Sequence, residues 1–175
     1  MSLAAQTHLP FELIVSDDGS TDGTVDRLEE FRKTAPFPVV IRRNETRLGY
    51  GENFLSAAKF ASGDYIAFCD QDDIWHPGKL TIAVEKLSQT GAQLFVHTAY
   101  LIDEIGNRIG VFAQGVKTSK VYEPLQLGPW SVFCGFSMVF RRELLALIET
   151  KDRGGHTFEF EGLLSHDLWV YFLAN

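Results

Sequence analysis

A fourfold alternation of short apolar runs with amphipathic segments narrows the possible folds of this 175-residue chain more than any other feature. The apolar runs are rich in β-branched and aromatic residues, as buried strands are, and the segments between them repeat apolar residues at helical spacing. The runs lie at 11–17, 37–43, 64–70 and 92–103, and the helical segments at 24–34, 51–62 and 79–87. This order predicts βαβ units, and hence an α/β domain with a mostly parallel sheet and right-handed crossovers.

The other segments extend the same domain to the end of the chain. The run at 64–70 is apolar almost throughout, so we expect it to be a central strand. Residues 104–110 form a turn that can start a hairpin, and 114–130 show little periodicity, which predicts a long loop. A strand that continues into a helix is predicted over 135–149, and another helix begins at "SHDLW". Because no repeat or linker interrupts the pattern, we predict one domain over residues 1–175.

The composition is that of an ordinary globular protein. Hydrophobic residues make up 45% of the chain, but no apolar run reaches the roughly 18 residues that a membrane-spanning helix needs. The formal net charge of −7 disfavours nonspecific attraction to nucleic acid or anionic lipid. Cys69 and Cys134 lie in apolar surroundings, which favours free buried thiols over a disulfide. With no signal-peptide pattern at the start, these features favour a cytoplasmic location.

The stretch "SDDGSTDGTVDRLEE" fits two kinds of site. Counted from Asp18, it has the ligand spacing of an EF-hand calcium loop. Counted from Asp17, it is a strand end, a turn and a capped helix, which is how a nucleotide pocket is built. An EF-hand needs a helix before its loop and normally a second loop, whereas here a strand precedes and no second loop exists. Ligands bind at the carboxyl ends of parallel strands, so the nucleotide pocket is the favoured interpretation.

A second acidic strand end, "FCDQDDIW", places Asp70, Asp72 and Asp73 within four residues. Three carboxylates this close repel one another, and a divalent cation relieves the repulsion. Oxygen ligands alone favour Mg²⁺ or Mn²⁺ over zinc, and a site with few protein ligands leaves positions open for diphosphate oxygens. The alternative is a solvated acidic turn that caps the helix after Pro77.

Five motifs in a fixed order resemble those of the family 2 glycosyltransferases. They are "VSDDGSTDGT", "NETRLGYGENF", "YIAFCDQDDIW" with "PGKL" after it, "GFSMVFRREL" and "HDLW". The closest likeness is to bacterial members described as rhamnosyltransferase-like, and it extends from about Gln6 to the end of the chain. The resemblance implies a GT-A fold, a Rossmann-like α/β domain that binds a nucleotide-diphospho-sugar. It also implies a nucleotide-binding half at about 9–90 and an acceptor-side half at about 91–175.

On the donor side, the resemblance implies that Asp18 accepts a hydrogen bond from the ring N3–H of uracil or thymine. Asp17 would be structural or help hold the base, and Asp70 would contact the ribose and share the metal. Asp72 would be the main ligand of the Mg²⁺ or Mn²⁺ that bridges the diphosphate, and Asp73 either a third acid or a helix cap.

Further residues take roles from the same resemblance. Arg47, Gly49 and Asn53 would lie near the nucleotide, although a plain loop with a helix start explains them as well. On the acceptor side, Asp167 matches the catalytic base, and the alternative for it is a helix N-cap. Gly135 and Phe136 match a region that borders the acceptor in the family. His166 is assigned to the acceptor side as a supporting or surface residue rather than a catalytic one. Trp169 either lines the acceptor site or is a core aromatic.

The chain departs from the family at its beginning. The family opens with a strand of the type "VSVIIPTYN" and a helix, whereas this sequence starts at "MSLAAQTHLPFEL". We therefore expect an N-terminally truncated domain whose exposed sheet edge promotes dimerisation, strand exchange or weak nucleotide binding.

The resemblance implies a metal-assisted, inverting transferase for cell-surface polysaccharide synthesis. Its donor would be a UDP- or dTDP-sugar and its acceptor a saccharide or lipid-linked saccharide, with no nucleic acid partner. A homodimer and contact with the inner face of the membrane are compatible with this interpretation. The non-enzyme alternative is a truncated, inactive nucleotide- or sugar-binding module. A sugar-phosphate nucleotidyltransferase would share the fold type, but the Gly-rich N-terminal loop of that class is absent.

Overall fold

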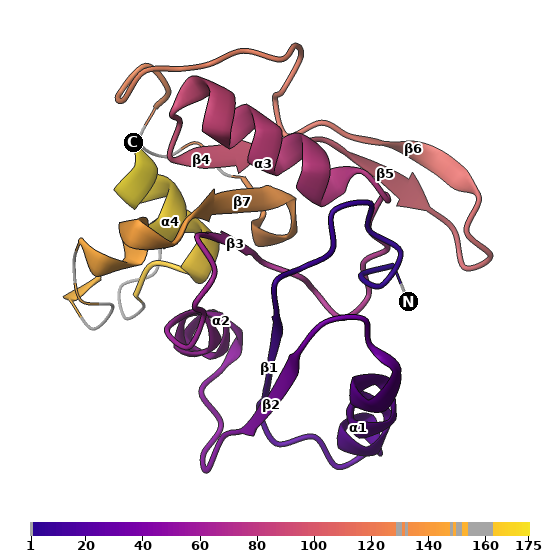
Figure 1. The fold of residues 1–175 in the computed structure, drawn as a ribbon. Helices are drawn as coiled ribbons and strands as arrows, with labels where there is room; N and C mark the ends of the chain where they lie inside the picture. Colours follow the sequence, from indigo (N-terminus) through magenta and orange to yellow (C-terminus); the bar gives the residue numbers. More distant parts are fainter. Residues whose placement is uncertain (1, 129–130, 132, 148, 150–151, 154–162) are drawn as a thin grey trace.

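The computed structural model describes residues 2–128, 131, 133–147, 149, 152–153 and 163–175 (Figure 1). Its strands are β1 (Leu13–Asp17), β2 (Val39–Arg43), β3 (Tyr65–Ala67), β4 (Leu94–Val96), β5 (Ala99–Ile102), β6 (Arg108–Phe112) and β7 (Met138–Arg141). Its α-helices are α1 (Thr24–Thr34), α2 (Tyr50–Ala58), α3 (Lys79–Thr90) and α4 (His166–Ala174), with short 3₁₀ helices η1 (Gly135–Ser137) and η2 (Arg142–Ala146). The predicted order of strands and helices is confirmed, and α1 has the predicted bounds.

The strands form three groups. β1 and β2 pair in parallel, from Leu13 opposite Val39 to Asp17 opposite Arg43. β7 lies between β3 and β4 and runs antiparallel to both, so β3 and β4 point the same way. β5 and β6 form an antiparallel hairpin. The α/β class is confirmed. The strands are not mostly parallel, because β7 runs antiparallel to both of its neighbours and β5 and β6 are antiparallel to each other.

Three local predictions need correction. The predicted central strand at 64–70 is β3, which lies at the edge of its group, and β7 takes the centre. The predicted strand at 92–103 is two strands, β4 and β5, that join different groups. The helix predicted after β7 is the 3₁₀ helix η2 in its described part. Local apolarity indicated strands at 64–70 and 92–103 but could not identify the partner of each strand, and it did not predict that most of β5 is exposed.

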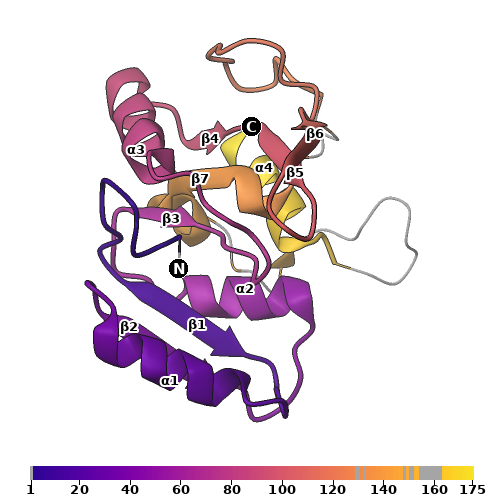
Figure 2. The same ribbon diagram turned by 90° about the vertical axis from the view of Figure 1, so that its right-hand side faces the viewer.

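Helices lie on both sides of the β1–β2 pair and of β7. Figures 1 and 2 show the β1–β2 pair between α1 and α2. β7 has core on both faces: Val139 packs with Ala83 and Leu87 of α3, whereas Met138 and Phe140 belong to the cluster that includes residues of α4. Alternate side chains of a strand point to opposite faces, so β7 links the α3 and α4 layers.

The β5–β6 hairpin and the loop after it extend from this core (Figure 1). No helix or strand occurs in the described part of the predicted 114–130 loop. Within the described ranges, no helix has the length and apolarity to cross a bilayer. Cys69 and Cys134 are both free, as predicted, but each is half-buried rather than buried. The N-terminal truncation and the two-half organisation stay predictions.

Candidate active site

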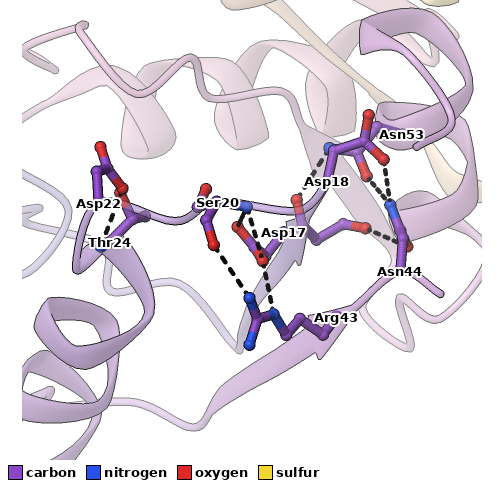
Figure 3. A network of polar contacts seen from close by, with 9 residues as sticks. Asp17, Asp18, Ser20, Asp22, Thr24, Arg43, Asn44 and Asn53 are labelled. Carbon is purple, nitrogen blue, oxygen red and sulfur yellow. Dashed lines mark hydrogen bonds and ion pairs between the residues drawn. The ribbon is translucent and has the colours of Figure 1, made fainter. Parts of the chain in front are cut away.

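Asp17 is a buried carboxylate that fixes the turn after β1. It accepts hydrogen bonds from the backbone N–H of Ser20, at 3.1 and 3.3 Å to its two oxygens. Arg43, at the end of β2, donates its Nε–H to Asp17 at 3.2 Å (Figure 3). The Ser20 hydrogen bonds, followed by the Arg43 guanidinium, hold the pKa of Asp17 below its ordinary value. Because these groups already engage Asp17, its location fits the structural role better than contact with a base.

Asp18 points the other way and holds the loop that precedes α2. Its carboxylate accepts hydrogen bonds from the backbone N–H groups of Leu48 and Gly49, at 2.7 and 2.9 Å, and from Asn44 Nδ2 at 2.8 Å. The Leu48 and Asn44 bonds are the main reason why the pKa of Asp18 is below its ordinary value. Asp18 is therefore ionised and preorganised, with its oxygens largely occupied by this loop.

Asn44 connects the residues around Asp18, and the sequence analysis missed it. Its Nδ2 also donates to Asn53 Oδ1 at 2.8 Å, and Asn53 in turn donates to the Ser16 carbonyl at 2.9 Å (Figure 3). Asn44 directly follows β2, so the signal that singled out Asp17 and Asp18, a polar residue at a strand end, applied to it as well.

The loop at 44–49 lies against Asp18, whereas its predicted place near a nucleotide stays a prediction. Gly49 has φ +78°, which favours glycine, and it is the N-cap residue of α2. Arg47 is exposed and lies over Gly19, where an added Cβ would approach Arg47 Nε to 3.5 Å. Arg47, Gly49 and Asn53 are thus brought together with Asp18.

The acidic turn after β3 carries three carboxylates, whose charge Lys79 offsets only in part. The Asp73 N–H donates to the Asp70 carbonyl at 3.4 Å, which closes the turn. Burial, then the charges of Asp73, Asp72 and Asp167, raise the pKa of Asp70. Burial also raises the pKa of Asp73, whose Oδ2 is buried and has no hydrogen-bond partner among the described residues.

These oxygens fit a hard divalent cation that shares the site with a ligand. No group of three or more His, Cys, Asp or Glu side chains in the described part of the chain is arranged to hold a metal. Asp70 and Asp72 could supply two carboxylates, and a bound diphosphate would have to supply further oxygens.

Lys79 lies beneath the acidic turn and was not singled out by the sequence analysis. Its Nζ donates to the Phe136 carbonyl at 2.7 Å and lies 3.6 Å from the centre of the Trp75 ring. Burial lowers the pKa of Lys79 to about 8, although the charges of Asp73 and Asp70 oppose this shift. Lys79 therefore joins the acidic turn to η1. The signal that could have found it is the position of Lys79 at the first turn of a helix directly after the acidic motif.

Asp167 occupies the first turn of α4 and faces the acidic turn. It accepts hydrogen bonds from Ser165 Oγ and from the backbone N–H of Leu168, the latter at 2.8 Å. Its charge contributes to the raised pKa of Asp70 and of Cys134.

His166, which directly precedes Asp167, packs edge-on against Phe68, two residues before Asp70, with ring centres 4.9 Å apart. The structure thus brings the first turn of α4 close to the acidic turn, although the two segments are distant in the sequence.

The other acceptor-side candidates belong to η1 or to α4. His166 is buried next to Gly135, and Phe136 packs with Phe112 of the hairpin at 6.1 Å between ring centres. Trp169 is 1% exposed and packs with leucines of the core, which fits the alternative of a core aromatic.

The calcium-loop alternative is wrong for this chain. Strand β1, rather than a helix, precedes the loop. Asp18 is bonded to Asn44 and to the amides of the loop at 44–49, and Asp22 accepts hydrogen bonds from the N–H and hydroxyl of Thr24 at the start of α1. The acidic spacing therefore reflects a strand end followed by a helix start.

Comparison with protein families gives a match to the model described as glycosyl transferase family 2, over residues 1–148. An uncharacterized glycosyltransferase of Nostoc sp. is 31% identical over 82% of this chain and 46% of its own length. The Escherichia coli UDP-Glc:alpha-D-GlcNAc-diphosphoundecaprenol beta-1,3-glucosyltransferase is 32% identical over 63% and 42%. The dTDP-rhamnosyl transferase of Shigella flexneri is 34% identical over 54% and 34%. The chain thus spans less than half the length of each of these relatives.

Solved structures match the same region. TarS residues 1–349 of S. aureus in complex with UDP has a TM-score of 0.67 at 23% identity, covering 83% of this chain and 42% of that one. The mannosyltransferase PcManGT of Pyrobaculum calidifontis, in complex with GDP-Man and Mn²⁺, has a TM-score of 0.58 at 21% identity, covering 83% and 40%. At these identities the likeness concerns the fold.

Proposed function

Because the chain belongs to glycosyl transferase family 2 and has its GT-A fold, we propose that it transfers a sugar from a nucleotide-diphosphate donor to a saccharide acceptor. The observation that carries the proposal is the contact between Phe68 and His166, which brings the acidic turn with Asp70 close to the first turn of α4 with Asp167. Asp70, half-buried beside two further acids, would bind a cation and diphosphate, and Asp167 would receive a proton.

We infer a UDP- or dTDP-sugar as the donor. Asp18 is ionised, and a carboxylate can accept a hydrogen bond from the N3–H of uracil or thymine but not from cytosine, which has no hydrogen there. Because amides of the loop at 44–49 now occupy Asp18, base binding requires part of this loop to move or to share the carboxylate. The names of the Escherichia coli and Shigella relatives, with UDP-Glc and dTDP-rhamnosyl, support the same pair of nucleotides.

The chemistry we propose is an inverting displacement. The acceptor hydroxyl oxygen forms a bond to the anomeric carbon, its proton passes to an Asp167 oxygen, and the bond from the anomeric carbon to the phosphate oxygen breaks with its electrons on the diphosphate. When bound at Asp70 and Asp72, Mg²⁺ or Mn²⁺ would stabilise that negative charge. The presence of Mn²⁺ in the PcManGT complex supports this choice of ion.

The acceptor is proposed from the same relatives. The Escherichia coli name describes a diphosphoundecaprenol-linked sugar, so we propose a saccharide or lipid-linked saccharide acceptor in surface polysaccharide synthesis. A lipid-linked acceptor would place the chain at the inner face of the membrane, in line with the cytoplasmic location expected from the sequence.

Calorimetric titration of UDP and dTDP, with and without Mn²⁺, tests the donor site. We expect binding to the wild-type chain that depends on Mn²⁺ and is weakened about tenfold or more in Asp72→Ala, because that variant lacks a metal carboxylate. Asp167→Asn is the matched control, because it should bind UDP normally and lose transfer. A nucleotide affinity that is the same with and without Mn²⁺, and the same in the wild type and in Asp72→Ala, would contradict the metal site. Normal binding by the wild type without any transfer would favour the alternative of an inactive binding module.

A further inference from the structure

Gly135 and His166 make a contact that excludes every side chain larger than hydrogen at position 135. A Cβ built on Gly135 would lie 2.5 Å from His166 Nε2 and 3.2 Å from Cδ2, and real Cβ atoms essentially never approach other atoms closer than 3.0 Å. The φ of Gly135 lies outside the left-handed region, so its backbone would accept other residues. The histidine ring therefore occupies the space that a Cβ at position 135 would need.

Aromatic rings from two other elements close around His166. The imidazole is stacked on Phe54 of α2, with ring centres 4.4 Å apart and an interplanar angle of 15°. Phe68, directly after β3, meets the same ring edge-on at 4.9 Å. His166 is 6% exposed, and its Nδ1 has no hydrogen-bond partner among the described residues. The ring is thus positioned by packing on three sides rather than by hydrogen bonds.

His166 directly precedes Asp167, so whatever fixes its ring also fixes the first turn of α4. The backbone at the start of α4 also lies close to Gly51 of α2, where an added Cβ would be 3.7 Å from the His166 backbone nitrogen. Phe68 is two residues before Asp70, and Gly135 begins η1, whose Phe136 carbonyl binds Lys79. The ring therefore links the base candidate to the acidic turn and to the acceptor side at once.

We propose that His166 is a positioning residue that holds Asp167 at its working distance from Asp70, and that Gly135 is a glycine in order to admit it. This inference rests on the proposed function, because it takes Asp167 to be the base. Burial, which lowers the pKa of His166, supports it: a neutral imidazole leaves the neighbouring carboxylate free to accept a proton.

A double-mutant cycle of Gly135→Ala, His166→Ala and the combined variant tests the proposal. UDP or dTDP release from UDP-glucose and dTDP-rhamnose with Mn²⁺ gives kcat and KM, and thermal unfolding gives stability. Gly135→Ala in the wild-type background should lower kcat about 10- to 100-fold through misplacement of Asp167, with KM for the donor little changed. In the His166→Ala background the same substitution should lower kcat almost no further, because the imidazole with which the new Cβ would clash has been removed. Gly128→Ala, where an added Cβ meets nothing closer than 3.9 Å, is the matched control.

The possible results separate the contact from the function. Equal losses of kcat from Gly135→Ala in both backgrounds would overturn the positioning role, even if the stability cycle shows coupling. If Gly135→Ala does not fold, folding of the combined variant with the kcat of His166→Ala supports the proposal, and failure of the combined variant to fold overturns it. If nucleotide release is unchanged in Asp167→Asn, or absent in the wild type, the base assignment is overturned and this inference with it. Non-additive changes of Tm in the double-mutant cycle would then still show that the contact between position 135 and His166 exists.

Discussion

Asp17 and Asp18 are consecutive residues with the same charge and opposite structural tasks. Successive side chains of a strand point to opposite sides, so Asp17 turns inward to Ser20 and Arg43, and Asp18 turns to the loop at 44–49. Asp17 stabilises the turn after β1. Asp18 orders the loop at 44–49, which faces the nucleotide in our proposal.

The pH dependence of stability should report the task of Asp17. Its folded pKa is lowered, so its contribution is complete above the ordinary Asp pKa of about 3.9 and is lost as the pH falls through the folded value. We expect Asp17→Asn to cost about 1 kcal/mol at pH 7, at the lower end for charged hydrogen bonds because Arg43 is 61% exposed. Urea unfolding at about pH 7 and about pH 2.5, on either side of the ordinary Asp pKa, checks this. If the difference in the free energy of unfolding between the wild type and Asp17→Asn does not become smaller at the acidic pH, this expectation is contradicted.

Asp70 should behave in the opposite way. Burial and neighbouring carboxylates raise its folded pKa, so ionised Asp70 destabilises the metal-free chain at neutral pH, and this penalty disappears below about pH 4. Asp70→Asn should therefore raise Tm at pH 7 by about 2–4 °C if it relieves about 1 kcal/mol. Mn²⁺ with UDP should raise Tm of the wild type and leave that of the variant unchanged. A variant with a lower Tm than the metal-free wild type would refute this account.

At the scale of elements, Arg141 joins β7 to the end of α3. Its Nε donates to the Ala92 carbonyl at 3.1 Å, and Nη2 donates to the Leu87 carbonyl at 3.2 Å. The guanidinium also lies over the Tyr65 ring of β3, 5.5 Å from its centre. One side chain thus ties together the C-terminus of a helix and two paired strands.

Replacing Arg141 with Met should lower the free energy of unfolding by about 1.5–3 kcal/mol, because two carbonyls lose a charged donor while the apolar stem is kept. Arg141→Lys should recover only part of this, since an ammonium cannot reproduce the planar fork. Urea unfolding of the three proteins measures both effects. Full stability in Arg141→Lys would mean that charge alone, rather than the two-pronged geometry, joins these elements.

At the scale of the whole molecule, the β5–β6 hairpin leaves a large apolar surface. Ile105 at its turn is 83% exposed and Ile109 is 67% exposed, with Tyr100, Leu101, Ile102 and Val111 also open to solvent. Isolated two-stranded hairpins are only marginally stable, and exposed apolar patches promote association.

We therefore expect the chain to associate with itself as its concentration rises, in line with the homodimer considered from the sequence. Replacing Ile105 and Ile109 by Ser should weaken association several-fold and change Tm little, since neither side chain contributes to the core. Sedimentation velocity over a concentration series checks this. Wild-type protein that stays a monomer throughout the series would contradict the expectation.

Local sequence alone was enough to establish the order of strands and helices, the acidic residues at two strand ends and the family motifs. It was enough because periodic apolarity and turn residues are recorded locally, over a few positions each. The bounds of α1 and the free state of both cysteines were predictable for this reason.

The contacts between groups far apart in the chain became known only from the tertiary structure. β7 takes the centre between β3 and β4, Asn44 reaches Asp18, Lys79 is buried against the Phe136 carbonyl, and His166 lies on Gly135. Apolarity indicates that a residue is buried but not against what, because packing depends on shape and distance between segments remote in sequence. Candidate residues for the chemistry could therefore be proposed from the sequence, whereas the residues that hold those candidates in place could not.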